Sequence, residues 1–283
     1  MDIGTLVVIL LGCLAAGLLS GSFAGLLGIG GGFTTVPVLN YLLPLAAVPD
    51  RHVMHVALAT SLAVMIANTA TAAWWRWRAG NLNPVLTATL AAPVALGALA
   101  GALFADGLAD WVLRLGFIGF VAIVLLRALY LLARRKTRKP KAVTASSEAS
   151  LPTIAFWAPY FWMTGVTGAM AGGGAATFTL PFLVARRYGM AQAAGQAAAL
   201  SAVIGLVAAG TFALVGTAGG DLPPYSLGYL YLPAMAGLMV GGQIGVPRGV
   251  KLAQRLSDRQ LRGLFLGFLG VVLLAMLGKN LGL

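Results

Sequence analysis

Long apolar runs separated by short polar segments make up almost the whole chain. The first run, residues 3–49, contains no charged residue at all. About 20 consecutive apolar residues are enough to cross a bilayer as a helix, so the pattern predicts an all-α polytopic membrane protein. The expected elements are residues 5–27, 33–45, 53–75, 83–105 and 115–133, followed by 151–170, 177–185, 191–218, 227–246 and 261–278.

Composition agrees with a membrane protein and excludes a soluble domain of this size. Hydrophobic residues make up 59% of the 283 residues and charged residues only 9%, with a mean hydropathy of +0.91. The net charge of +12 would suit nucleic-acid binding in a soluble protein. Here the basic residues cluster between apolar runs and indicate membrane orientation instead. Cys13, the single cysteine, excludes an intrachain disulfide and a cysteine-based zinc site, and we expect no metal, cofactor or nucleic acid.

The order of the apolar elements repeats, which indicates an internal duplication. We assign residues 1–133 to a first transmembrane repeat, 134–150 to a basic linker and 151–283 to a second repeat. Matching positions keep their order at offsets of 140 to 148 residues: Ser61 and Ser201, Pro93 and Pro233, Gly97 and Gly237, Gly101 and Gly241, Asp110 and Asp258, Arg114 and Arg262. Chance supplies single matches but hardly the ordered set.

The distribution of Lys and Arg predicts how the two repeats are oriented. Sixteen of the 19 basic residues, including those of the linker 134–150, fall on one side of the predicted spans, and Arg51, Arg114 and Lys279 fall on the other. The positive-inside rule places the richer side in the cytoplasm, so we expect a cytoplasmic linker and an inner-membrane location. The repeats then enter from opposite sides as two inverted-topology repeats, a construction common in secondary transporters.

Two glycine clusters lie at matching places in the repeats. Residues 28–37 read Gly-Ile-Gly-Gly-Gly-Phe-Thr-Thr-Val-Pro, and residues 172–181 read Gly-Gly-Gly-Ala-Ala-Thr-Phe-Thr-Leu-Pro. Clustered glycine and proline interrupt a helix, and irregular backbone at membrane depth is tolerated only inside protein or beside a water-filled cavity. The pattern predicts Gly-broken helices or re-entrant hairpins. Because residues 33–45 are too few to cross the bilayer alone, a re-entrant hairpin and two tilted spans both remain open.

A helix that restarts after such a break can bind an anion. Its first N–H groups lack intrahelical partners, and the helix dipole is positive there. The predicted substrate-binding residues are Gly28, Gly30, Gly31, Gly32, Thr34, Thr35, Gly172, Gly173, Gly174, Thr177 and Thr179 at the breaks, with Ser61, Asn68, Gln196 and Ser201 on the elements that follow. Hydrogen bonding between helices is the alternative role of the last four. Glycines at four-residue spacing elsewhere are typical of close helix packing: Gly17, Gly21, Gly97, Gly101, Gly237 and Gly241.

His52 and His55 lie three residues apart at the start of the third apolar element. Histidine titrates near neutral pH, so one hypothesis gives His55 a part in proton-coupled or pH-sensitive transport. The simpler interpretation is a hydrogen-bonded histidine at the membrane interface. The sequence around the two histidines has no acidic partner in a metal-binding pattern such as HExxH.

The seven acidic residues avoid the centres of the predicted spans, which argues against a proton relay of carboxylates through the membrane. Asp110 and Arg114 stand four residues apart at the start of a predicted helix, as do Asp258 and Arg262. This spacing suits a carboxylate at a helix N-terminus that also forms an ion pair along the helix. A capping role explains both pairs without a substrate.

The glycine motifs and the sequence after them resemble the sulfite/organosulfonate exporter family, TauE/SafE. The resemblance rests on Gly-Ile-Gly-Gly-Gly at 28–32, Val36-Pro37, His-Val-Ala-Leu-Ala-Thr-Ser at 55–61 and the second cluster with Leu180-Pro181, and it extends over nearly the whole chain. It implies an inner-membrane carrier that moves sulfite, sulfonates such as sulfoacetate or related sulfur-containing anions, mostly outward.

We therefore expect a secondary transporter and not an enzyme, with a small sulfur-containing anion and the lipid bilayer as its partners. A carrier for another small anion, such as a carboxylate, is the alternative within transport. An intramembrane enzyme is disfavoured because the spans have no paired carboxylates, no cysteine–histidine set and no metal-ligand spacing. A membrane scaffold is the third alternative, and the sequence leaves the existence of a homodimer open.

Overall fold

The described part of the chain is almost entirely helical. The computed structural model describes residues 3–27, 31–133, 151–216, 222–253, 255–256 and 258–280. The helices there are α1 (Ile3–Leu27), α2 (Gly32–Leu42), α3 (Val53–Arg78), α4 (Pro84–Asp106), α5 (Asp110–Ala133), α6 (Leu151–Met170), α7 (Ala176–Ala185), α8 (Met190–Val215), α9 (Leu232–Ala253) and α10 (Asp258–Asn280). Two 3-10 turns, η1 (Leu43–Ala46) and η2 (Asp50–His52), join α2 to α3. Gly28, Gly30 and the predicted linker 134–150 lie outside the described residues.

Each predicted apolar element corresponds to one of these helices, with boundaries that shift by a few residues. The element expected over 227–246 differs most. Its start is a short antiparallel hairpin, β1 (Ser226–Leu227) and β2 (Leu230–Tyr231), and α9 then continues to Ala253. Gly228 turns the hairpin with a φ of +54°, a conformation that glycine adopts without strain. Pro233 then fits the first turn of α9, where its missing N–H is not needed.

The surface of the fold is that of a membrane protein. Five of the described helices are long and apolar enough to cross a membrane by length and composition: Gly4–Leu26, Asp50–Arg78, Pro84–Asp106, Asp110–Tyr130 and Met190–Val215. Large apolar side chains on them face outward, with Val85 73%, Ile123 66% and Leu206 64% exposed. Soluble proteins rarely expose apolar surface on this scale, whereas lipid-facing helices do. The predicted all-α polytopic membrane class is confirmed.

In the predicted first repeat, the short helix α2 returns antiparallel along α1. The Ser20 hydroxyl of α1 donates to the carbonyl oxygen of Gly31, just before α2, at 3.1 Å. Nearer the start of α1, a Cβ built at Gly12 would lie 3.2 Å from Leu42, the last residue of α2. With 11 residues, α2 is about 16 Å long, which is too short to cross the hydrocarbon layer by itself.

The predicted second repeat contains a similar arrangement. Tyr160 of α6 donates through its hydroxyl to the carbonyl oxygen of Phe178, near the start of α7, at 2.9 Å. Further back along α6, the ring of Trp157 packs edge-on against Phe182, later in α7, at 5.3 Å between centroids. With 10 residues, α7 is about 15 Å long. Each repeat therefore opens with a long helix and a short helix that folds back along it.

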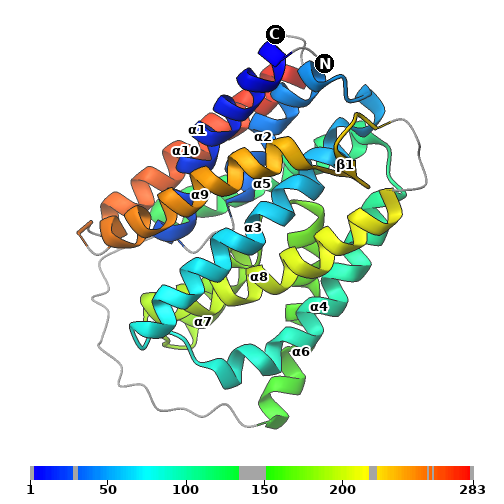
Figure 1. The fold of residues 1–283 in the computed structure, drawn as a ribbon. Helices are drawn as coiled ribbons and strands as arrows, with labels where there is room; N and C mark the ends of the chain where they lie inside the picture. Colours follow the sequence, from blue (N-terminus) through cyan, green and yellow to red (C-terminus); the bar gives the residue numbers. More distant parts are fainter. Residues whose placement is uncertain are drawn as a thin grey trace.

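Helices of the two repeats are interleaved (Figure 1). The first helix of each repeat packs along the fourth helix of the other: α1 along α9, and α6 along α4. The third helices, α3 and α8, pack against each other, and each also contacts the fourth helix of the other repeat. The contacts that the first and third helices of one predicted repeat make with the fourth helix of the other therefore each occur twice, with the roles of the two repeats reversed.

Small residues form the α1/α9 and α4/α6 seams. A Cβ atom built at any of the glycines predicted to pack would come within 2.9 Å of a backbone oxygen of the facing helix: Gly17, Gly21, Gly97, Gly101, Gly237 and Gly241. The backbones therefore touch directly, which supplies the van der Waals contact that holds membrane helices together. The prediction that these glycines serve packing is confirmed.

Gly101→Leu is expected to lower the thermal stability of the detergent-solubilised protein. Its Cβ would press on the backbone of Val166 in α6, and overpacking a close interface costs about 1–3 kcal/mol. Gly116→Leu is the matched control, because a Cβ at Gly116 in α5 meets nothing within 4 Å. The two melting temperatures are compared in one detergent. Equal shifts in both variants would contradict the role of the seam.

Candidate functional site

Both predicted glycine breaks interrupt the helices. Gly31, immediately before α2, has a φ of +79°, and Gly172 and Gly174, between α6 and α7, have φ of +60° and +68°. Residues with a Cβ rarely adopt this left-handed conformation. Glycine at these three positions therefore lets the chain end one helix and start the next within a few residues.

The two breaks touch each other at the centre of the protein. A Cβ built at Gly32 would overlap the carbonyl oxygen of Gly172, so the first residue of α2 lies against the backbone of the second break. A Cβ at Gly172 would in turn lie 3.2 Å from the side chains of Val36 and Leu58. Gly31, Gly32 and the cluster 172–174 are brought together as predicted, and the described residues hold the breaks closed against each other.

The matched serines connect the breaks to the central helices. Ser61 of α3 shares a 2.6 Å hydrogen bond with the hydroxyl of Thr35 in α2. Ser201 of α8 accepts a 2.8 Å hydrogen bond from the backbone N–H of Ala175, directly before α7. Both serines are at most 1% exposed. The structure thus places Ser61 and Ser201 at the first and second break respectively.

Unpaired hydrogen-bond donors gather where α2 and α7 begin. The hydroxyl oxygens of Thr34, Thr177 and Thr179 are buried and have no hydrogen-bond partner among the described residues. The backbone N–H groups at the first two positions of each short helix likewise have no partner there: Gly32, Phe33, Ala176 and Thr177. Buried donors without partners are costly, and at a helix N-terminus they suit an oxyanion.

The two predicted amide residues lie away from the breaks. Gln196 accepts a 2.6 Å hydrogen bond from the Thr87 hydroxyl and donates a 2.8 Å hydrogen bond to the carbonyl oxygen of Asn83, so both ends of its amide bond the start of α4. Asn68 accepts from Gln243 of α9 at 3.5 Å, and its buried amide nitrogen has no partner among the described residues. Hydrogen bonding between helices, the alternative role, accounts for both the oxygen and the nitrogen of the Gln196 amide and for the oxygen of the Asn68 amide.

His55 lies at the opposite end of α3 from Arg76 and Arg78, and it is 3% exposed. Its Nδ1 is 4.0 Å from Asp110 Oδ1, and neither ring nitrogen has a hydrogen bond among the described residues. The pairing of Asp110 with Arg114 is confirmed at 2.9 Å. Asp110 also accepts the backbone N–H of Met54 at 2.5 Å, so the carboxylate caps α3 as well as pairing within its own helix. The sequence interpretation missed this acidic neighbour of His55.

The comparisons with known proteins agree with this architecture. The family model described as Sulfite exporter TauE/SafE matches residues 13–276. The chain belongs to this family. A curated relative from Haemophilus influenzae, named "Probable membrane transporter protein", is 30% identical over 267 residues, which cover 94% of this chain and 97% of that protein. No solved structure matches the chain significantly. This TauE/SafE protein is therefore a multi-pass membrane transporter.

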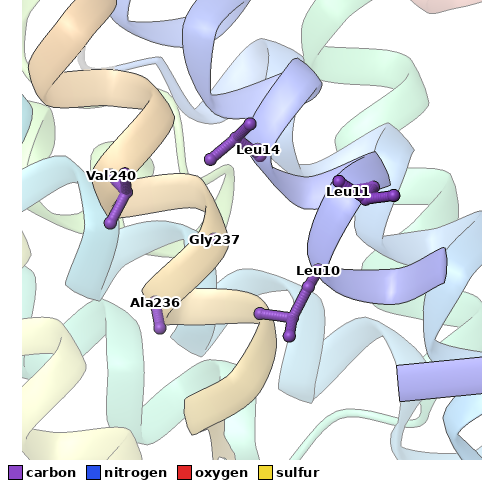
Figure 2. Close-up of a pocket in the computed structure, with 6 residues that line it drawn as sticks. All are labelled: Leu10, Leu11, Leu14, Ala236, Gly237 and Val240. Carbon is purple, nitrogen blue, oxygen red and sulfur yellow. The ribbon is translucent and has the colours of Figure 1, made fainter. Parts of the chain in front are cut away.

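A hollow on the surface of this TauE/SafE protein lies apart from the breaks. Figure 2 shows it between α1 and α9, lined by Leu10, Leu11, Leu14, Ala236, Gly237 and Val240. Its volume is about 210 Å³. Leu11 is 62% exposed and Val240 53% exposed, and the side chains that line the hollow carry no polar atom. An apolar, outward-facing hollow of this kind suits lipid and cannot pair an anion.

Aromatic rings close one side of the breaks in this TauE/SafE protein. A Cβ at Gly173 would lie 2.9 Å from the ring of Phe33, which stacks on Phe120 of α5 at 5.8 Å. Phe120 in turn contacts Phe178 of α7 at 6.1 Å. The sequence interpretation did not assign these rings to the site. The only signal was the position of Phe33 and Phe178 beside the threonines of the two clusters.

No metal-binding group of three His, Cys, Asp or Glu side chains occurs among the residues that the structure describes. Ser20, whose hydroxyl binds the carbonyl oxygen of Gly31, is a further residue that sequence reasoning missed. It lies within the apolar first helix, outside the glycine cluster. Its contact fixes the turn that brings α2 back along α1.

Proposed function

We propose that this transporter is a secondary carrier that exports sulfite or a small organosulfonate, such as sulfoacetate, across the inner membrane. The anion binds at the glycine breaks between the two repeats. The observation that carries the proposal is the contact between the start of α2 and the break that precedes α7, with buried and unpaired donors at the starts of both helices. Membership of the TauE/SafE family supports the substrate class.

The proposed arrangement is a pair of inverted repeats with the basic linker in the cytoplasm. The symmetry of the contacts between the repeats supports it. The packing of α1 on α9 corresponds to that of α6 on α4, and the packing of α3 on α9 corresponds to that of α8 on α4. The basic residues on one side of the spans support opposite insertion of the two halves. In such a construction, half-helix starts meet near the middle of the bilayer.

The chemistry of the breaks favours an anion with several oxygens. The groups available there are donors: backbone N–H groups of both short helices and the hydroxyls of Thr34, Thr177 and Thr179. The dipole of each short helix also places partial positive charge at its start. Sulfite and sulfonate groups carry three oxygens in a pyramid and can accept from two helices at once, whereas a carboxylate presents two oxygens in one plane.

Binding requires the breaks to separate. In this conformation Gly32 rests on the carbonyl oxygen of Gly172, which occupies the position that an anion would need. We infer that it is a closed state and that opening toward either side parts the two breaks. The Ser61–Thr35 and Ser201–Ala175 hydrogen bonds keep each short helix attached to its central helix during this movement.

Flux into proteoliposomes tests the function. Purified protein is reconstituted, and labelled sulfite, sulfoacetate and acetate are compared side by side with empty liposomes. Saturable flux of sulfite or sulfoacetate, with little flux of acetate, is expected. If acetate shows saturable flux and neither sulfite nor sulfoacetate does, the substrate class is a carboxylate. The absence of saturable flux for all three would contradict transport of small anions.

A further inference from the structure

A cluster of titratable groups surrounds His55 at the end of α3 away from the predicted linker. The ring of Tyr229, in the turn between β1 and β2, packs on His55 at 5.1 Å and on His52 at 5.6 Å. The Tyr229 hydroxyl is hydrogen-bonded to Asp106, the last residue of α4. Burial and this carboxylate raise the pKa of Tyr229, so it stays neutral at physiological pH. The hairpin therefore forms a lid over the buried imidazole.

The charges around the histidines balance when both histidines are neutral. Arg51, Asp106 and Asp110 act on the histidines directly, and Tyr229 of the hairpin packs on both rings. Arg114 of α5 pairs with Asp110, and Lys279 of α10 interacts with Asp50 of η2 and with Asp110. The region thus contains three carboxylates and three cations. Protonation of one histidine changes this local charge from balanced to positive.

His55 is the group built to accept that proton. It is buried beside the carboxylate of Asp110, and both of its ring nitrogens lack a hydrogen bond among the described residues. A neutral imidazole in this position leaves a buried donor and a buried acceptor unpaired, which is costly. A protonated imidazole gains an ion pair with Asp110, whose oxygen lies 4.0 Å from Nδ1. His52 is partly exposed and so meets water more directly.

We propose that His55, paired with Asp110, is the binding site for a proton whose uptake is coupled to anion binding at the glycine breaks. The inference rests on the proposed function. The proton comes from water on the hairpin side and binds a free nitrogen of the neutral imidazole, so no covalent bond other than N–H changes. The carrier is then a proton-linked anion transporter, and the ligand of this second site is H⁺.

The two sites lie close enough to influence each other. His55 and Ser61 are six residues apart on α3, which is about 9 Å along the helix. Ser61 is hydrogen-bonded to Thr35 at the first break. Two opposite charges at this separation in a partly buried setting attract enough to change binding by on the order of tenfold. Protonation of His55 therefore strengthens anion binding, and a bound anion strengthens proton binding by the same factor.

The chain offers an unusually clean measurement, because it has two histidines in total. His52→Gln leaves His55 as the single histidine, so full-length protein labelled on histidine gives one imidazole signal by NMR. The signal is followed from about pH 5 to pH 8 with and without saturating sulfoacetate, whose acids stay ionised over this range. We expect the midpoint of the signal change to rise by about one pH unit with sulfoacetate, since one unit corresponds to a tenfold change in affinity. An unchanged midpoint would overturn the coupling.

Flux provides the second readout. In wild-type proteoliposomes, the apparent affinity for sulfoacetate should fall by roughly tenfold as the pH on the hairpin side rises through the histidine range. His55→Gln should retain saturable flux and lose this pH dependence, while His52→Gln should keep it. Persistence of the pH dependence in His55→Gln would overturn the proton site.

The two proposals fail in different ways. Wild-type protein that neither binds nor carries sulfoacetate contradicts the proposed function. Wild-type protein with saturable sulfoacetate flux, together with a His55 signal that ignores sulfoacetate, contradicts the proton site alone. The NMR arm does not use a His55 variant, so it remains decisive even if His55→Gln fails to fold.

Discussion

Gly32→Ala is expected to lower anion flux strongly while leaving the protein in the membrane. The added Cβ would overlap the carbonyl oxygen of Gly172, which is backbone and cannot rotate away as a side chain would. The two breaks could then no longer close on each other, and a carrier that cannot close cannot alternate between its two sides. An overpacking cost of about 1–3 kcal/mol corresponds to about 5- to 150-fold in the closed-state population, and flux should fall accordingly.

Gly119→Ala is the control for this change. Gly119 lies in α5, and a Cβ built there meets nothing within 4 Å. Both variants are reconstituted at equal density, and initial rates of sulfite and sulfoacetate flux are compared with the wild type. Gly119→Ala should carry anions at the wild-type rate. Wild-type rates in Gly32→Ala would show that the contact between the breaks has no part in transport.

Thr179→Val is expected to weaken anion transport without weakening the fold. The Thr179 hydroxyl is fully buried and has no hydrogen-bond partner among the described residues. Valine has nearly the same shape, so replacing an unpaired hydroxyl should leave stability unchanged or raise it. A hydrogen bond from this hydroxyl to a bound anion would be worth about 1.5–3 kcal/mol. The ratio kcat/KM for sulfoacetate should therefore fall by about 10- to 100-fold.

Stability and transport measured together distinguish a substrate contact from a structural one. Loss of a substrate contact lowers transport but not stability, whereas loss of a structural hydrogen bond lowers stability. Thr211→Val is the matched control, because the Thr211 hydroxyl is also buried but donates to the carbonyl oxygen of Val207 in its own helix at 2.8 Å. Melting temperature and flux are measured for both variants, and Thr177→Val tests the neighbouring hydroxyl in the same way. Normal kcat/KM in Thr177→Val and Thr179→Val would remove the threonines from the site.

The helices and their breaks could be predicted from the sequence because both follow from local rules. A run without charges has to satisfy its backbone internally and so becomes a helix, and clustered glycines interrupt it where they stand. The packing role of Gly97 and Gly241 was readable for the same reason, since four-residue spacing puts small residues on one helix face. These predictions needed no knowledge of which helices are neighbours.

The missed features all depend on contacts between distant segments. Asp110 lies 55 residues after His55 in the chain, and only the packing of α5 against the start of α3 brings them together. The amide of Gln196 was predicted to face substrate, yet the start of α4 supplies partners for both of its ends. The hairpin before α9 was taken for helix because its apolar side chains fit either structure. Tertiary context decides each of these cases.

The seam between α1 and α9 has a consequence for biosynthesis. The ribosome completes α1 first and starts α9 only after roughly 200 further residues, which takes on the order of ten seconds or more at usual elongation rates. Throughout that time the glycine face of the nascent α1 has no cognate helix and is open to lipid, to the insertion machinery or to a neighbouring chain. The packing of α1 in its final place therefore waits for α9.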